Sequence, residues 1–283
     1  MPPTLYLVAT PIGNLEDITL RALRVLREVA LIAAEDTRRT ARLLTHYGIH
    51  TPTTSFYEQV EREKVPGLIA RLTAGESLAV VSDAGTPGVS DPGYRLVRAA
   101  VDAGIRVEAV PGASAVLAAL ATSAFPTSPF SFIGFPPARA HARNEWLRHL
   151  GDRTETLVFF EAPHRIRETL ESARGILGDR PIAVARELTK VHEEVIRGPI
   201  SDVLSRLRVA RGEFTIVLTG ADPTVRSIEA VPDPAVLLHE FGRLTDTPGC
   251  TRRTAISRLA QRYGLASRAV YALLERAKAE AGG

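Results

Sequence analysis

Cysteine is nearly absent from this chain of 283 residues, in which Cys250 is the only one. A single cysteine cannot form an internal disulfide, and it supplies no cluster for a structural zinc site. We therefore expect a protein of a reducing compartment, the cytoplasm, without disulfides and without a bound metal.

Long hydrophobic runs are also missing. No apolar stretch approaches the roughly 20 residues that a bilayer-spanning helix needs. The first residues, MPPTLYLVATPIGN, contain neither a basic segment nor a small-residue cleavage site. We therefore expect no signal peptide and no association with a membrane.

Several well-known site motifs do not occur. The sequence contains no G-x-x-x-x-G-K-[ST] loop, and no G-x-G-x-x-G follows its first apolar run, which excludes the common phosphate and dinucleotide sites. It also lacks H-E-x-x-H and G-x-S-x-G. Neither a metalloprotease helix nor the nucleophile turn of α/β-hydrolases is therefore indicated.

Charge is distributed unevenly along the chain. The 35 basic and 32 acidic residues give a net charge of +3. Residues 250–283 contain seven basic and two acidic side chains, which sum to +5, so the preceding part sums to −2. A cationic end favours a polyanionic partner, although a solvated, Arg-rich helix surface has the same composition.

Short apolar runs alternate with amphipathic segments such as residues 19–30, 94–103 and 166–177. This alternation predicts an α/β fold with mostly parallel sheets. Several runs are continuously apolar, as buried central strands are. The expected strands are residues 5–9, 31–34, 78–82, 106–110, 130–134, 156–160, 182–185 and 214–218.

Two polar, proline-containing stretches interrupt the alternation, ATSAFPTSPF at 121–130 and GADPTVRSIEAVPDP at 220–234. We therefore predict an N-terminal α/β domain at 1–120 that carries the ligand loops. A second α/β domain at 121–222 should complete the cleft, and a basic helical tail should occupy 232–283.

The tail shows helical periodicity on both sides of the sequence GLAS. Two short helices joined by a turn that contains glycine resemble a helix-turn-helix, although such pairs also occur as plain packing modules. The apolar positions that define the two helices are Ile256, Leu259, Ala260 and Tyr263, then Val270, Leu273, Leu274 and Ala277.

Four turn-rich loops follow expected strands: TPIGN at 10–14, SDAGTPG at 82–88, PGASA at 111–115 and EAPHR at 161–165. Ligands of open α/β sheets bind beyond the carboxyl ends of the strands, and glycine lets backbone approach a ligand closely. We therefore predict a cleft at this edge. With little Lys or Arg in its loops, it should be nearly neutral and suit an amphoteric ligand, of which S-adenosyl-L-methionine is one example.

Seven sequence blocks resemble those of one protein family, the ribosomal RNA small subunit methyltransferase I family of the tetrapyrrole-methylase superfamily. The resemblance covers essentially the whole chain, and SDAGTPGVSDPG is its most specific block. The blocks are TPIGNLEDITLRAL, AEDTRRTARLL, SDAGTPGVSDPGYRLV, VPGASAVLAAL, FIGFPP, FFEAPHRI and ARELTKVHEEVIRG.

The resemblance implies two α/β domains of the tetrapyrrole-methylase type with a cofactor cleft between them, plus a small helical C-terminal tail. It implies S-adenosyl-L-methionine as cofactor and a homodimer. The implied reaction is 2′-O-methylation of a cytidine ribose in the decoding region of 16S (small-subunit) ribosomal RNA. The substrate would be that RNA or the assembled small ribosomal subunit.

The resemblance also assigns cofactor contacts by position. For Ile12, Val89 and Leu188, ordinary core packing explains the residue type equally well. The positions that match cofactor contacts are Pro11, Ile12, Gly13, Asp83, Ala84, Gly85, Thr86, Val89, Ser114, Ala115, Phe160, Glu161 and Leu188.

Methyl transfer to a hydroxyl needs positioned reactants and benefits from a base. Candidate bases are Glu35, Asp36 and Lys190, although Asp36 equally fits an N-cap and Lys190 would need a depressed pKa. Further candidates are Glu161, Glu187, Glu193 and Glu194. Candidate phosphate contacts are Arg38, Arg39, Arg165 and Arg186, with Arg252, Arg253, Arg258 and Arg262 of the tail.

Three alternatives stay open at this point. The first is a methylase of the same superfamily that acts on a tetrapyrrole, but a small substrate needs no basic tail. A modified histidine on an elongation factor is possible on fold grounds alone. A non-catalytic RNA-binding assembly factor is the third, and the intact ligand loops argue against it.

Overall fold

A computed structural model describes residues 2–208, 211–221, 233–246, 250–263, 265 and 267–281. The chain divides into two compact units, Met1–Gly220 and Ala221–Gly283. Most of the linker predicted at 220–234 lies outside the described residues. Within the described ranges, no helix is long and apolar enough to cross a membrane.

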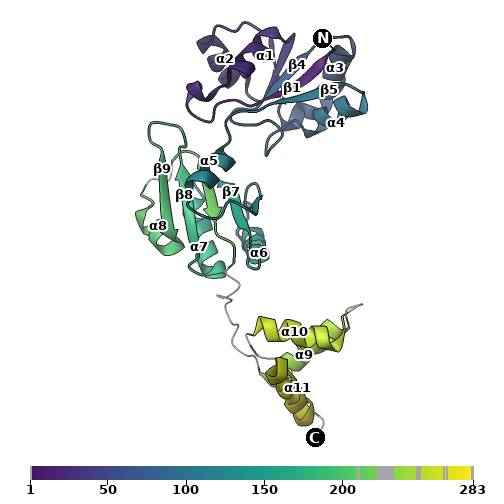
Figure 1. Ribbon diagram of the computed structural model, residues 1–283, viewed down its shortest axis with the longest axis vertical. Helices are drawn as coiled ribbons and strands as arrows, with labels where there is room; N and C mark the ends of the chain where they lie inside the picture. The colour runs from purple at the N-terminus through teal and green to yellow at the C-terminus, as the bar shows by residue number, and fades with distance from the viewer. Residues whose placement is uncertain are drawn as a thin grey trace. The chain divides into compact units, whose positions relative to one another are not determined.

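The first sheet is entirely parallel and has the strand order β3-β2-β4-β1-β5 (Figure 1). Because alternate residues of a strand face opposite sides of its sheet, Ile32 and Ala34 pack with α1 and α2, whereas Leu31 and Ala33 pack with α3 and α4. Burial on both faces accounts for the continuous apolar runs.

The elements of this half are β1 (Thr4–Val8), a 3-10 turn (Leu15–Asp17), α1 (Leu20–Glu28), β2 (Leu31–Ala34), α2 (Thr37–His46), β3 (Thr53–Ser55), α3 (Glu58–Thr73), β4 (Leu78–Val81), α4 (Tyr94–Asp102), β5 (Arg106–Val110) and α5 (Ala115–Thr122).

The second sheet has the order β6-β7-β10-β8-β9 and is mostly antiparallel, because only β6 and β7 pair in parallel. The expectation of mostly parallel sheets is therefore wrong for this half. The physical reason lies in the connections: residues 187–193 join β8 to β9 directly and form no crossover helix. β10 then inserts between β7 and β8 and runs against both.

The elements of this half are β6 (Phe130–Phe132), α6 (Ala140–Leu150), β7 (Thr156–Glu161), α7 (Ile166–Leu177), β8 (Pro181–Arg186), β9 (Glu194–Pro199), α8 (Ile200–Arg206) and β10 (Phe214–Leu218).

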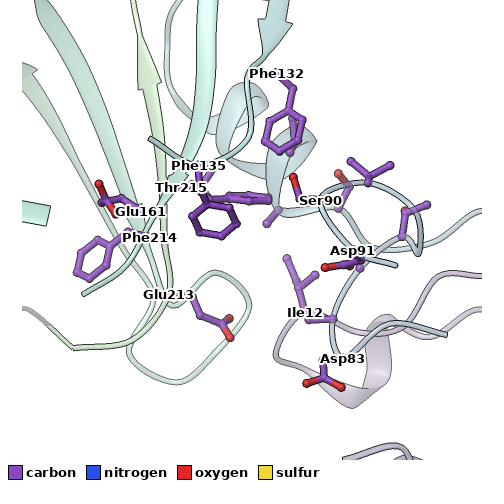
Figure 2. Close-up of a pocket in the computed structure, with 18 of the residues that line it drawn as sticks. Ile12, Asp83, Ser90, Asp91, Phe132, Phe135, Glu161, Glu213, Phe214 and Thr215 are labelled. Atoms are coloured by element: carbon purple, nitrogen blue, oxygen red, sulfur yellow. The ribbon is translucent and has the colours of Figure 1, made fainter. Parts of the chain in front are cut away.

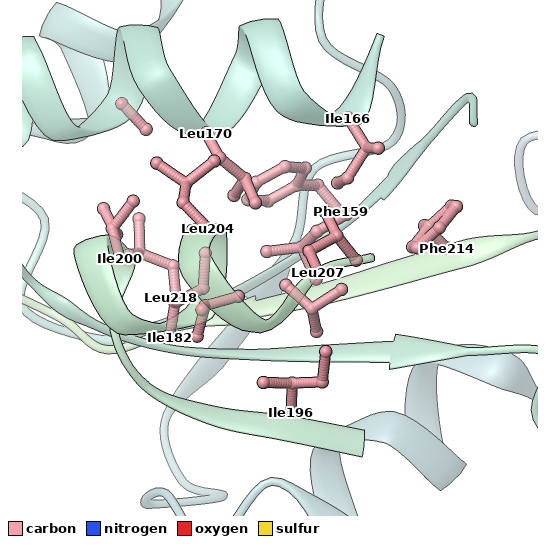
Figure 3. Packing of buried hydrophobic residues seen from close by; sticks show 14 of the residues in the cluster. Phe159, Ile166, Leu170, Ile182, Ile196, Ile200, Leu204, Leu207, Phe214 and Leu218 are labelled. Atoms are coloured by element: carbon pink, nitrogen blue, oxygen red, sulfur yellow. The ribbon is translucent and has the colours of Figure 1, made fainter. Parts of the chain in front are cut away.

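The core of the second half lies between one face of its sheet and the helices α6, α7 and α8. Figure 3 shows Ile166 and Leu170 of α7 on one side of this core and the strand residues Ile182 and Ile196 on the other. The opposite face of the sheet packs against α5, whose Leu120 is buried in the same cluster as residues of β7, β8 and β10. Helix α5 thus runs from the end of the first sheet onto the second.

The second unit consists, in its described part, of α9 (Pro234–Thr245), α10 (Arg252–Arg262) and α11 (Ser267–Ala281). The two predicted tail helices are confirmed, and Leu259 and Leu274 from their apolar faces are buried with Phe241 of α9. Helix α9 lies within the predicted helical tail at 232–283, but the periodicity argument had not identified it as a separate helix. Its Asp233 side chain accepts a hydrogen bond from the Ala235 N–H, and Pro234 occupies the first turn, a common helix start.

Candidate functional site

A cavity of about 560 Å³ lies between the two halves of the first unit (Figure 2). Its first wall comes from loops that follow β1, β2, β4 and β5, and its second from β6, β7, β10 and the loops beside them. The cavity lies at the carboxyl ends of the parallel strands, where ligands of α/β sheets bind. Its volume suits a small molecule.

The loop after β4 is held against the loop after β1 by a pair of backbone hydrogen bonds and by the Thr10 hydroxyl, which donates to the Ser82 carbonyl at 3.1 Å. The Thr10 N–H donates to the Gly85 carbonyl at 2.9 Å, and the Gly85 N–H donates to the Thr10 carbonyl at 3.0 Å. Gly85 adopts a φ of 81°, a conformation that favours glycine. The predicted sharp turn therefore brings backbone to the cavity wall.

A second close approach ties the two halves together beside the cavity. The Asn14 N–H donates to Thr189 Oγ1 at 3.0 Å. A Cβ at Gly13 would lie 2.5 Å from Lys190 Cγ and 2.9 Å from the Leu188 carbonyl oxygen. Gly13 therefore lets the loop after β1 touch the β8–β9 loop directly.

Most of the predicted cofactor positions meet in this cavity. Pro11, Gly13 and Leu188 do not line it; Leu188 is instead buried in an apolar cluster with Ile12. The predicted positions that line the cavity are Ile12, Asp83, Ala84, Gly85, Thr86, Val89, Ser114, Ala115, Phe160 and Glu161.

The cavity is acidic, which corrects the expectation of a nearly neutral cleft. Among the described lining residues, Arg39 is the only cation, and it pairs with Asp83 at 3.3 Å. The composition of the single loops did not predict this negative charge, because the acidic residues come from the ends of different strands and meet only in the folded protein. The acidic lining residues are Glu35, Asp83, Asp91, Glu161 and Glu213.

Glu35 and Asp83 hold the ends of β2 and β4 together. The Asp83 N–H donates to Glu35 Oε2 at 3.1 Å, and the Asp36 N–H donates to Asp83 Oδ1 at 3.0 Å. Burial raises the pKa of Glu35, and the charge of Asp83 adds to this, whereas the Asp83 N–H and Arg39 oppose it. Glu35 is thus a structural carboxylate that also faces the cavity.

Asp36 is the N-cap of α2 and accepts a hydrogen bond from the Arg38 N–H at 2.8 Å. The Arg38 side chain and backbone hold the pKa of Asp36 well below its usual range. Asp36 does not line the cavity. The structure therefore favours capping over catalysis for Asp36, and it shows Arg38 paired with that carboxylate on the surface.

Lys190 is poorly suited to be a base. Its burial lowers the pKa of its ammonium, but hydrogen bonds to Glu187 at 2.9 Å and Glu213 at 3.1 Å outweigh this and raise the pKa overall. It also does not line the cavity. A side chain that keeps its proton more firmly than a free lysine does not accept one, so the base role predicted for Lys190 is not supported.

Two arginines predicted to contact RNA are occupied inside the protein. Arg165 pairs with Glu161 at 2.8 Å, and both side chains are largely buried. Arg186 pairs with Glu194 at 3.2 Å across β8 and β9, and only 15% of its side chain is exposed. Burial and pairing leave neither guanidinium available to a phosphate.

Arg39 remains accessible at the cavity, with 60% of its side chain exposed. In the tail, Arg252 pairs with Glu275 and lies over the Phe241 ring, and Arg262 pairs with Glu240. Arg253 and Arg258 are exposed on α10. The last two are therefore the predicted tail contacts most available to a polyanion.

Sequence reasoning missed two groups of lining residues. Phe130, Phe132 and Phe135 form an aromatic wall in which the Phe135 and Phe160 rings lie 5.3 Å apart. In the sequence, the block FIGFPP, which contains Phe132 and Phe135, and Phe130 just before it could have indicated this aromatic wall. The second group is residues 212–215 with Ser90 and Asp91. Asp91 lies in the block SDAGTPGVSDPG, three residues beyond the predicted loop at 82–88, and nothing in its local sequence marks it as facing a ligand.

Comparison with known proteins adds independent information. The family profile described as Tetrapyrrole (Corrin/Porphyrin) Methylases matches residues 4–204. A Xylella fastidiosa protein named Ribosomal RNA small subunit methyltransferase I is 49% identical over 78% of this chain and 82% of its own length. A Synechocystis sp. protein of the same name is 42% identical over 95% of this chain and 96% of its own length.

Solved structures extend the similarity to the fold. A uroporphyrin-III-C-methyltransferase from Thermus thermophilus superimposes with a TM-score of 0.55 at 22% identity, over 76% of this chain and 94% of that chain. At such an identity the match supports the two-sheet architecture alone.

Proposed function

We propose, from the premise that the chain belongs to the tetrapyrrole methylase family and to its ribosomal RNA small subunit methyltransferase I members, that it transfers a methyl group from S-adenosyl-L-methionine to small-subunit ribosomal RNA. The acceptor in this proposal is the 2′-oxygen of a cytidine ribose in the decoding region. A homodimer that acts in the cytoplasm belongs to the same proposal.

The observation that carries the proposal is the charge and shape of the cavity. S-adenosyl-L-methionine bears a sulfonium and an ammonium, and a wall with Glu35, Asp83 and Asp91 attracts such cations. A phosphate-bearing cofactor would meet these same carboxylates with Arg39 as its only lining cation among the described residues. The residues present therefore fit a cationic methyl donor.

The apolar part of the cavity fits the rest of that molecule. Ile12, Phe160 and Val116 offer surfaces for a flat base, and Gly85, which has no side chain, lets the backbone of its loop form part of the wall. When bound, the donor supplies an activated methyl group. The protein then has to hold the donor and the acceptor oxygen in line and keep water out.

The names of the relatives support RNA as the substrate, and so does the charge of the tail. Residues 250–283 sum to +5, and Arg253 and Arg258 on α10 are exposed. Phosphate contacts supply much of the affinity of proteins for nucleic acids. The tail is therefore proposed to bind ribosomal RNA while the first unit carries out methyl transfer.

The site of methylation tests the proposal directly. Incubation of the protein with labelled S-adenosyl-L-methionine and unmodified small ribosomal subunits should place one methyl group on a ribose in the RNA. Mass spectrometry of nuclease digests distinguishes a methylated sugar from a methylated base. A methyl group on a base would contradict the proposed acceptor, and label in protein or in no product would contradict the proposed substrate.

Donor binding should depend on the absence of a side chain at Gly85. Gly85→Val forces a φ of 81° on a β-branched residue and places its side chain at the cavity wall. We expect donor affinity, measured by calorimetry, to fall by at least about tenfold, or about 1.4 kcal/mol.

Gly75→Val is the matched control for this substitution, because Gly75 also has a positive φ, 100°, but has open space around it and does not line the cavity. It should impose similar backbone strain and leave donor affinity unchanged. Equal affinities for the wild type and a folded Gly85→Val protein would show that the donor lies elsewhere.

A further inference from the structure

The cavity has an apolar part that the donor, placed as proposed above, does not occupy. In that placement the two cations of the donor meet carboxylates, and its base meets apolar side chains that include Phe160. The aromatic wall, Phe130, Phe132 and Phe135, lines the cavity as well. Figure 2 shows Phe132 and Phe135 at the end of the cavity away from Asp83. The aromatic wall is therefore available to a second ligand.

A bend at Gly134 brings Phe135 into the aromatic wall. Side chains of a strand alternate between its two faces, so Phe135, three residues after Phe132, would point away from the cavity in a continued strand. Gly134 instead adopts a φ of 70°, a conformation that favours glycine, and its carbonyl accepts the Phe160 N–H at 2.9 Å. Phe132 and Phe135 consequently line the same cavity.

The aromatic wall is partly exposed to solvent. Phe135 is 53% exposed and Phe130 is 37% exposed, although both side chains are large and apolar. The Phe135 ring packs on one neighbour, the Phe160 ring, at 5.3 Å and an angle of 55°. Val89, from the loop after β4, is a further exposed apolar side chain that lines the cavity. Exposed apolar side chains that meet at a cavity are typical of a ligand site.

The absence of charge on the aromatic wall limits the kind of ligand that it can hold. Among the described lining residues, Arg39 is the only cation, and it pairs with Asp83, which lies at the other end of the cavity (Figure 2). A phosphate would therefore find no cation at the wall. A flat, uncharged ring fits better, and bases of unpaired RNA stack on aromatic side chains in this way.

The proposed reaction brings such a ring close to the donor. The acceptor oxygen belongs to a ribose, and the nucleotide has to leave the stack of its RNA strand to place this ribose inside a cavity, as the target nucleotides of base-modifying enzymes do. Its base then lacks its stacking neighbours. We propose that the aromatic wall, with Phe135 as its main contact, stacks against the base of the acceptor nucleotide, an inference that rests on the proposed function.

Stacking at Phe135 would fix the position of the acceptor. A base held against the wall places the attached ribose between the wall and the donor, so the 2′-oxygen is positioned for an in-line attack on the methyl group. The ring itself is essential for this role, because an aliphatic side chain of similar volume offers no flat face to a base. Phe135→Tyr keeps the ring, and Phe135→Leu keeps most of the apolar volume without it.

The test measures kcat/KM for small ribosomal subunits at saturating S-adenosyl-L-methionine. Phe135→Ala should lower it by about thirtyfold, or about 2 kcal/mol, which lies within the range measured for single base–aromatic stacks. Phe135→Leu should lower it by at least about fivefold. Phe135→Tyr should stay within about twofold of the wild type.

Two controls show where the loss arises. Calorimetry with the donor and without the ribosomal subunit should give Phe135→Ala an affinity within about twofold of the wild type, which also shows that the variant is folded. Tyr94→Ala removes another exposed aromatic ring, one that does not line the cavity, and it should leave kcat/KM within about twofold of the wild type.

The outcomes separate this inference from the proposed function. A wild-type protein that methylates no ribosomal RNA contradicts the proposed function itself. An active wild type overturns the stacking role alone if Phe135→Ala or Phe135→Leu matches it, or if Tyr94→Ala is impaired as much as Phe135→Ala. Weaker donor binding by a folded Phe135→Ala protein also overturns it, because the ring would then hold the donor. If Phe135→Ala does not fold, the comparison of Phe135→Leu with Phe135→Tyr decides.

Discussion

Replacing Glu161 with alanine is expected to lower the free energy of unfolding by about 3–5 kcal/mol, the cost of leaving one member of a buried ion pair alone. The Glu161 side chain has no exposed surface. It accepts hydrogen bonds from the Ala162 N–H at 2.7 Å and the Thr169 hydroxyl at 2.5 Å, and it pairs with Arg165. Alanine would leave a largely buried guanidinium without its partner. Urea unfolding measures the loss.

Two control proteins identify the cause. Glu28→Ala removes a carboxylate from another i,i+4 pair, with Arg24, in which both side chains are more than half exposed, and it should cost less than about 1 kcal/mol. The double variant Glu161→Leu with Arg165→Met removes both charges and should recover much of the stability. A Glu161→Ala protein as stable as Glu28→Ala would contradict the assigned burial.

Removing the second unit should weaken binding to small ribosomal subunits by about a hundredfold at low salt. Two charge-assisted phosphate contacts, at about 1.5 kcal/mol each, amount to about 3 kcal/mol, which is this factor. A protein that ends at Gly220 keeps every lining residue of the cavity, so its donor affinity should not change. Filter binding over a salt series measures the first quantity and calorimetry the second.

The full-length variant Arg253→Gln with Arg258→Gln refines this test. Arg252 and Arg262 are left in place because they pair with Glu275 and Glu240 and contact aromatic rings, so their replacement would also disturb packing. The slope of log affinity against log salt should become shallower by about 1 for each lost phosphate contact. Unchanged affinity and slope in both proteins would make the tail a packing module.

The first sheet was the most predictable part of the fold. Strands β2 and β5 begin and end at the predicted residues. Strand β2 is covered on both faces and is therefore a continuous apolar run, whereas β5 is an edge strand that alternates apolar residues with Arg106 and Glu108. Strand β3, Thr53–Ser55, and strand β9, with Gly198 and Pro199, are polar edge strands and carry no such signal. The strand directions of the second sheet also could not be predicted from the sequence, because they depend on β10, which inserts between β7 and β8 and runs antiparallel to both.

The site was predictable where it depends on loop composition. Thr10 to Asn14 and the loop from Ser82 do lie at the cavity end of the sheet, because parallel strands bring their carboxyl ends together. Charge pairing was less accessible to sequence reasoning. The i,i+4 spacing of Glu161 and Arg165 was a readable sign of an ion pair, but nothing local connects Lys190 with Glu213.

Burial of the Asp91 carboxyl in the cavity wall, which raises its pKa, affects the stability of the fold. An aspartate in an unfolded chain ionises near pH 3.8, whereas Asp91 in the folded protein does so near 6. The folded state therefore binds the proton more tightly, and the stability that this contributes is complete below about pH 3.8 and is lost as the pH rises through 6.

The difference of about two pH units would be worth about 3 kcal/mol for a fully buried carboxyl, and solvent screening at this half-buried group reduces it. When the protein folds at a pH between these two values, Asp91 takes up a proton. At neutral pH the protein thus keeps an ionised carboxylate that makes its folded state less stable than a protonated Asp91 would.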